Sequence, residues 1–138
     1  MLLKLKADLK NLSQIRDFVA DTAADLGVAP GSLEDLRLAV DEAVTNIITH
    51  GYGGPGDIEL ELGVEASDLF VRIRDQAESF DPSLAQTTDL RPPGERDNPG
   101  GYGLFLMRSV MDEIAHRKIE TGNELTMIKR DVVLNKIH

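Results

Sequence analysis

Hydrophobic and polar positions along the chain follow two different periods. Residues 2–7 alternate apolar and polar side chains, as a β-strand does. Residues 12–26 instead place their apolar side chains three or four positions apart, and the following Gly27 suits the end of a helix. The first part of the chain therefore predicts a strand followed by a helix.

A second helical stripe follows a turn predicted at Pro30-Gly31. Ser32 and Asp35 have the spacing of a capping box, so we expect this helix to begin at Ser32. The stripe continues to about Tyr52, where a cluster of glycines and a proline ends it.

The second half of the chain predicts two hairpins separated by a loop and a helix. Residues 58–64 and 69–73 alternate around a short turn, as in a β-hairpin. Residues 76–100 hold most of the prolines without periodicity, and because a loop of that length is usually functional, we expect a lid there. A third helix over residues 101–113 and two strands, 114–120 and 125–133 around a turn at 121–124, complete the prediction.

These elements predict an α+β fold for residues 1–138, taken as one domain of ordinary size. Strands grouped in hairpins indicate a two-layer sandwich, in which a mixed or antiparallel sheet carries the helices on one face. A doubly wound parallel sheet does not fit this order of elements.

Composition and charge exclude several classes of function. The chain has no cysteine, which excludes disulfides, cysteine-ligated metals and a thiol nucleophile. Its 15 Lys and Arg residues against 24 Asp and Glu residues give a formal charge of −9, which argues against nucleic acid as a partner. No apolar run could span a membrane and the N-terminus lacks a signal-peptide core, so we expect a cytoplasmic protein without a membrane partner.

Polar side chains share one face of the second predicted helix. Glu42, Asn46 and His50 lie four positions apart, beside the apolar stripe. The spacing alone also fits a solvated helix face. However, a glutamate can act as a general base and an asparagine oxygen can bind Mg²⁺, so the stripe is a candidate site.

Two other segments add groups that suit a nucleotide. Asp75 ends a predicted strand, where a carboxylate can accept a hydrogen bond from an exocyclic amine such as that of adenine. Gly100, Gly101 and Gly103 open the third predicted helix, whose N-terminal N–H groups suit phosphate. Each segment alone also fits a turn or a cap, so the candidate site depends on their joint presence.

In this order the three segments resemble the motifs of a known superfamily. Residues 42–52 resemble the N box of the GHKL ATPases, residues 75–82 the G1 box and residues 101–107 the G2 box. The chain is most similar to the bacterial anti-sigma factor serine/threonine-protein kinases of that superfamily. The resemblance implies the Bergerat-type, histidine-kinase-like ATPase fold.

The resemblance also implies a role for each matching residue. Glu42 would be the general base, Asn46 the Mg²⁺ ligand and Asp75 the residue that recognises adenine. The remaining implied nucleotide-binding residues are Ala77, Phe80, Arg96 of the lid, Gly100, Gly101, Gly103, Leu104 and Thr126 on the last hairpin. Ala77 departs from the family, which has glycine at that position, and its methyl group would crowd the nucleotide or restrict the backbone.

The activity implied by the resemblance is ATP-dependent phosphoryl transfer. Such proteins bind ATP and Mg²⁺, often form homodimers, hold a sigma factor inactive, and phosphorylate a serine of a STAS-type anti-anti-sigma protein. Ala77 keeps open the alternative of a non-catalytic, nucleotide-responsive docking module. A sensor histidine kinase fits less well, because residues 1–30 predict a strand and a helix rather than a phosphoacceptor helical hairpin.

Overall fold

The computed structural model describes residues 1–48, 56–76 and 102–134, and for residues 102–105 the backbone alone. The elements are, in chain order, β1 (Leu2–Lys6), η1 (Leu9–Asn11), α1 (Leu12–Asp25), α2 (Pro30–Asn46), β2 (Asp57–Glu65), β3 (Asp68–Asp75), α3 (Tyr102–Val110), β4 (Glu113–Ile119) and β5 (Gly122–Lys129). The expected lid, except Gln76, lies outside the described residues.

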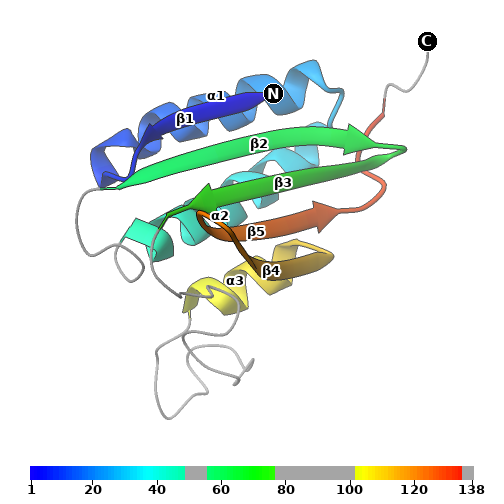
Figure 1. Cartoon of the computed structure of the whole chain (residues 1–138). Coiled ribbons are helices and arrows are strands. Elements are labelled where there is room, and N and C mark those ends of the chain that lie inside the picture. The colour runs from blue at the N-terminus through cyan, green and yellow to red at the C-terminus, as the bar shows by residue number, and fades with distance from the viewer. Residues whose placement is uncertain (49–55, 77–101, 135–138) are drawn as a thin grey trace.

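The strands form one five-stranded sheet in the order β1-β2-β3-β5-β4, and each neighbouring pair is antiparallel. All three helices lie against one face of this sheet (Figure 1). The expected α+β sandwich with helices on one face is therefore confirmed, and the sheet is antiparallel rather than mixed.

The core lies between the sheet and the helices. Alternate residues of the central strands point toward the helices, which is why their side chains are buried while their neighbours are not. Fully burying a side chain such as leucine or isoleucine contributes about 1.5–3 kcal/mol. The largest buried side chains are Ile15, Val19, Leu36, Ile47, Ile58, Leu60, Leu62, Leu69, Ile73, Met107, Leu125 and Met127.

The start of α2 differs from the sequence-based expectation. The N-cap residue is Ala29, which has no capping side chain, and Pro30 occupies the first turn. Ser32 lies inside that turn, so the expected capping box is wrong. Proline suits this position because its ring fixes a helical φ and it has no N–H to leave unpaired. Beyond Asn46 the helix widens into a π turn at residues 47–48, and the expected continuation to Tyr52 lies outside the described residues.

Only one of the two hairpin turns lies where the sequence predicts it. The β2–β3 turn lies where the sequence predicts it and is made by Ala66 and Ser67, with Ala66 at a φ of 57°. The β4–β5 turn is shorter than expected, because β5 begins at Gly122 and is already paired with β4 there. β5 ends at Lys129 rather than at residue 133.

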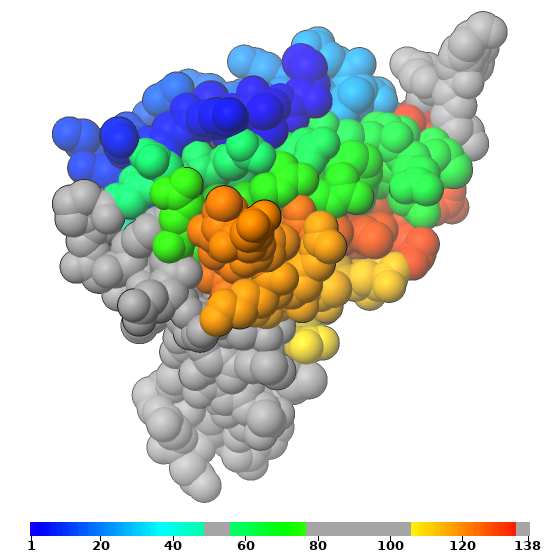
Figure 2. Space-filling model, viewed as in Figure 1, coloured from blue at the N-terminus to red at the C-terminus, as the bar shows by residue number. Residues whose placement is uncertain are grey.

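The face of the sheet away from the helices is charged. In Figure 2 this face is turned toward the viewer, and none of the helices that the structure describes covers it. Arg74, near the end of the middle strand β3, donates to three carboxylates, those of Glu59 at 2.7 Å, Glu61 at 2.8 Å and Glu124 at 2.7 Å. Burial alone would raise the pKa of Glu124, but hydrogen bonds from Arg117 and Arg74 lower it below its ordinary value.

Replacing Arg74 by methionine is expected to destabilise the fold by about 1–3 kcal/mol, because the carboxylate of Glu124 is buried and loses a charged partner. Lys6→Met is the matched control, since the Lys6 pair with Asp57 has a similar distance, 2.8 Å, but is exposed to solvent, and its loss should destabilise the fold much less. Urea unfolding measures both variants. Equal losses in the two variants would contradict a stabilising role for the Arg74 network.

The Arg74 effect should also depend on pH. The lowered pKa of Glu124 means that its ion pairs stabilise the fold above the unfolded pKa, and that this contribution is lost as pH falls through the folded pKa. The difference between Arg74→Met and the unsubstituted protein should therefore shrink in acid.

Candidate active site

Three element ends that carry the candidate residues lie at one end of the molecule. The C-terminal end of α2, the C-terminal end of β3 and the N-terminal end of α3 are together in Figure 1. The helices α2 and α3 also pack against each other. The fold therefore places Glu42 and Asn46, Asp75, and Gly103 at the same end of the molecule, although they are far apart in sequence.

Glu42 lies one turn before the end of α2 and is half-buried. Burial raises the pKa of its carboxyl group above the ordinary value, and the neighbouring negative charge of Asp41 raises it further. A carboxylate with a raised pKa accepts a proton more readily, which is the property required of a general base near neutral pH.

Asn46 lies one turn after Glu42, on the same face of the helix. Its side chain is only 9% exposed, and among the described residues its Nδ2 atom has no hydrogen-bond partner. Leaving such a buried amide unpaired costs about 1–3 kcal/mol. An unpaired buried amide beside a carboxylate is therefore suited to a ligand that supplies the missing partner.

The residues at this end fit a magnesium nucleotide. An amide offers an oxygen to a cation, or an N–H to a phosphate oxygen. The described residues contain no group of three or more His, Cys, Asp and Glu side chains that could hold a metal by themselves. Mg²⁺ in nucleotide sites commonly binds one or two protein ligands and completes its shell with water and phosphate oxygens.

Asp75 is the last residue of β3, and its side chain points to the helix-facing side of the sheet. It is 3% exposed and accepts a hydrogen bond from Asn123 Nδ2 at 3.0 Å. Its main-chain oxygen lies against Gly122, where an added Cβ would stand 1.9 Å away. The end of β3 is thus held tightly against the start of β5.

Thr126 does not lie with these residues. It pairs with Arg72 and Ala115 across the sheet and borders a shallow cavity on the open face, together with Arg74 and Glu124. Because side chains alternate between the two faces of a strand, Thr126 points away from the face that holds Asp75. The implied role of Thr126 in nucleotide binding therefore does not fit the structure.

Asn123 is the residue of β5 whose side chain hydrogen-bonds to Asp75, and sequence reasoning missed it. In the structure β3 pairs with β5, which sets Asn123 directly opposite Asp75. The predicted turn at residues 121–124 concealed that pairing, because it assigned Asn123 to a loop.

The other predicted site residues are only partly described. Gly103 and Leu104 lie in the first turn of α3, as expected for a phosphate-binding helix start. The remaining members of the predicted set lie outside the described residues: His50, Ala77, Phe80, Arg96, Gly100 and Gly101. Their roles stay predictions.

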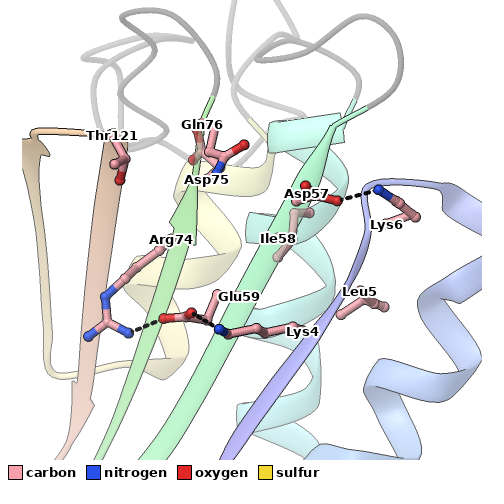
Figure 3. Close-up of a pocket in the computed structure, with 10 residues that line it drawn as sticks. All are labelled: Lys4, Leu5, Lys6, Asp57, Ile58, Glu59, Arg74, Asp75, Gln76 and Thr121. Carbon is pink, nitrogen blue, oxygen red and sulfur yellow. Dashed lines mark hydrogen bonds and ion pairs between the residues drawn. The ribbon is translucent and has the colours of Figure 1, made fainter.

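A cavity of about 570 Å³ opens beside β1, β2 and the end of β3 (Figure 3). Its charged lining residues are Lys4, Lys6, Asp57, Glu59, Arg74 and Asp75. Glu42 and Asn46 do not line it, so it meets the candidate active site only at Asp75.

Comparison with known proteins identifies the chain. Residues 5–129 match the histidine kinase-like ATPase domain family. The chain belongs to this family. Within it, the serine-protein kinase RsbW of Staphylococcus epidermidis is 36% identical over 135 residues, which cover 92% of this chain and 84% of the relative. The serine-protein kinase RsbW of Bacillus subtilis is 34% identical over 119 residues, covering 81% and 74%.

A solved structure has the same fold. The crystal structure of the RsbU and RsbW domains of Rv1364c from Mycobacterium tuberculosis matches 98% of this chain with a TM-score of 0.62 and 14% identity. The chain spans 35% of that longer protein. The relatives confirm the expected family and the expected kinase class over the docking-module alternative.

No helix within the described ranges is long and apolar enough to cross a membrane.

Proposed function

We propose that the protein binds ATP with Mg²⁺ and transfers the γ-phosphoryl group to a serine of a STAS-type anti-anti-sigma protein. The observation that carries the proposal is the pair on α2. Glu42 is half-buried and its pKa is raised, and one turn later the buried Asn46 amide has an Nδ2 with no partner among the described residues. This pair stands in a chain whose relatives, 32–36% identical, are named serine-protein kinases.

Each described residue has a definite part in this proposal. Asn46 would hold Mg²⁺, which when bound neutralises phosphate charge. Asp75 accepts a hydrogen bond from the exocyclic amine of adenine. The N-terminal N–H groups of α3, which include that of Gly103, bind phosphate oxygens.

The transfer step needs one base and one leaving group. The serine oxygen of the substrate attacks the γ-phosphorus, and the bond from that phosphorus to the β–γ bridging oxygen breaks. Glu42 takes the hydroxyl proton, ADP leaves with the bond electrons, and the substrate becomes a phosphoserine. Positioning and charge neutralisation dominate such reactions. The placement of Glu42 and Asn46 on one helix therefore contributes to the transfer rate.

The remaining parts of the proposal follow from the resemblance to anti-sigma factors. The protein sequesters a sigma factor, forms a homodimer and works as one domain over residues 1–138. A sigma-factor partner would place it in the cytoplasm. The predicted lid over residues 76–100 would close on the nucleotide.

Two measurements on the purified protein test the proposed function. Calorimetric titration with ATP and ADP is expected to show micromolar, Mg²⁺-dependent binding, despite Ala77. Incubation with γ-labelled ATP should then label a STAS-domain protein, but not a variant of that substrate whose acceptor serine is alanine. Absence of binding at millimolar ATP would overturn the proposal and favour the docking module.

A further inference from the structure

A chain of hydrogen bonds links three strands at the candidate active site. Asn123 is 1% exposed, and its Nδ2 donates to Asp75 Oδ1 at 3.0 Å. Its Oδ1 lies 3.1 Å from Nε2 of His116. An amide oxygen can only accept, so the hydrogen must be on Nε2 of His116. The two hydrogen bonds therefore run in one direction: His116 donates to Asn123, and Asn123 donates to Asp75.

Strand register explains why these three side chains meet. Asp75 on β3 is paired with Asn123 on β5, and His116 on β4 is paired with Leu125, two positions further along β5. Leu125 is buried in the core, so all three side chains are on the helix-facing side of the sheet. The network therefore lies on the side of the sheet that is covered by the helices, including α2 with Glu42 and Asn46 (Figure 1).

The network restricts the orientation of a buried carboxylate. Asp75 is the last residue of β3, and the Asn123 amide is one of the groups that contact its buried carboxylate. A donor fixed on Oδ1 sets the plane of the carboxylate, and His116 in turn sets the orientation of the Asn123 amide. A preorganised acceptor recognises a single N–H group better than a mobile one, because less freedom is lost on binding.

We propose that Asn123, oriented by His116, is a positioning residue for base recognition and holds the Asp75 carboxylate as the acceptor for the adenine amine. This inference rests on the proposed role of Asp75 in nucleotide binding. It makes Asn123 and His116 determinants of base specificity, although neither needs to contact the nucleotide.

The test compares two ligands that differ in one group. ATP carries the exocyclic amine, and purine riboside triphosphate has hydrogen in its place. Calorimetry on the full chain gives both dissociation constants, and their ratio measures recognition of the amine alone. We expect the unsubstituted protein to prefer ATP by about tenfold, the range of one hydrogen bond to a charged group.

The variants separate positioning from general damage. Asn123→Leu keeps the size of the side chain but removes its donor, and should reduce the preference for ATP to about twofold or less. His116→Met should reduce it in part, whereas His116→Gln, which retains a donor, should preserve it. A merely structural role would weaken both ligands equally and leave the ratio unchanged. The His116 pair keeps the test valid if Asn123→Leu does not fold.

Asp75→Ala distinguishes failure of the positioning role of Asn123 from failure of the proposed role of Asp75. If Asp75→Ala loses the preference for ATP while Asn123→Leu and His116→Met both keep it, the positioning role is overturned and the proposed function stands. If Asp75→Ala binds both ligands as the unsubstituted protein does, the proposed role of Asp75 fails together with the inference.

Discussion

Glu42→Gln is expected to lower the rate of phosphoryl transfer by about 10²–10⁴-fold, the usual contribution of a general base. Glutamine has the shape of glutamate and cannot take the serine proton. ATP affinity should stay within about twofold, because the proposed nucleotide contacts are made by other residues, Asn46 and Asp75 among them. Single-turnover transfer from labelled ATP and calorimetry measure the two quantities. Equal transfer rates would remove Glu42 from its role.

The same substitution should make the fold more stable at neutral pH. Burial and the charge of Asp41 raise the pKa of Glu42, so the folded protein disfavours the ionised carboxylate. The sign follows directly: stability falls as pH rises from the unfolded pKa, 4.5, through the raised folded pKa, and the loss remains above it. Glu42→Gln carries no charge and avoids that loss, so its melting temperature at neutral pH should exceed that of the unsubstituted protein.

Asp41→Asn is the matched control for the pH dependence. Asp41 adjoins Glu42 in sequence and pairs with Arg16 at 2.8 Å, outside the proposed chemistry. Removing its charge removes one cause of the raised pKa of Glu42. In a plot of transfer rate against pH, the rise on the acid side should therefore shift to lower pH, while transfer itself persists. An unshifted rise would mean that another group controls it.

The sequence predicts the fold well where local pattern and tertiary packing agree. Leu60 and Leu62 alternate with glutamates, and their strand pairs with β3 around the expected turn. The predicted start of α2 is wrong. Ser32 and Asp35 have the spacing of a cap, but the helix begins at Pro30. In that case backbone geometry outweighed a side-chain hydrogen bond.

The candidate site depends more strongly on contacts distant in sequence. The four-residue spacing of Glu42 and Asn46 is visible in the chain, but the burial of the Asn46 amide, and its lack of a partner within residues 1–48, 56–76 and 102–134, are properties of the folded core. The neighbour of Asp75 depends on the register between β3 and β5, which a two-residue difference in a turn changes. Thr126 is implied by the resemblance alone, and the predicted turn at residues 121–124 hides Asn123.

Gly122→Ala tests that register directly, and we expect it to impair both folding and nucleotide binding. A Cβ at this position would stand 1.9 Å from the main-chain oxygen of Asp75 and 2.7 Å from Cα of Gln76. Those atoms belong to the backbone, so the clash cannot be relieved by turning a side chain. The φ of 154° is itself unfavourable for alanine. The end of β3 must therefore move away from β5.

That movement would separate Asp75 from its hydrogen-bond donor on β5. The stability loss should be about 1–3 kcal/mol by urea unfolding, and ATP should bind at least about tenfold more weakly.

Two other glycines separate the causes of this effect. Gly63→Ala also creates a clash, at 2.3 Å, but with the Phe70 ring on the open face, so it should reduce stability and leave ATP affinity unchanged. Gly31→Ala meets nothing within 4 Å and lies in the first turn of α2, so it should be neutral or stabilising. If Gly122→Ala resembles Gly63→Ala and binds ATP normally, the contact between β3 and β5 stabilises the sheet without shaping the nucleotide site.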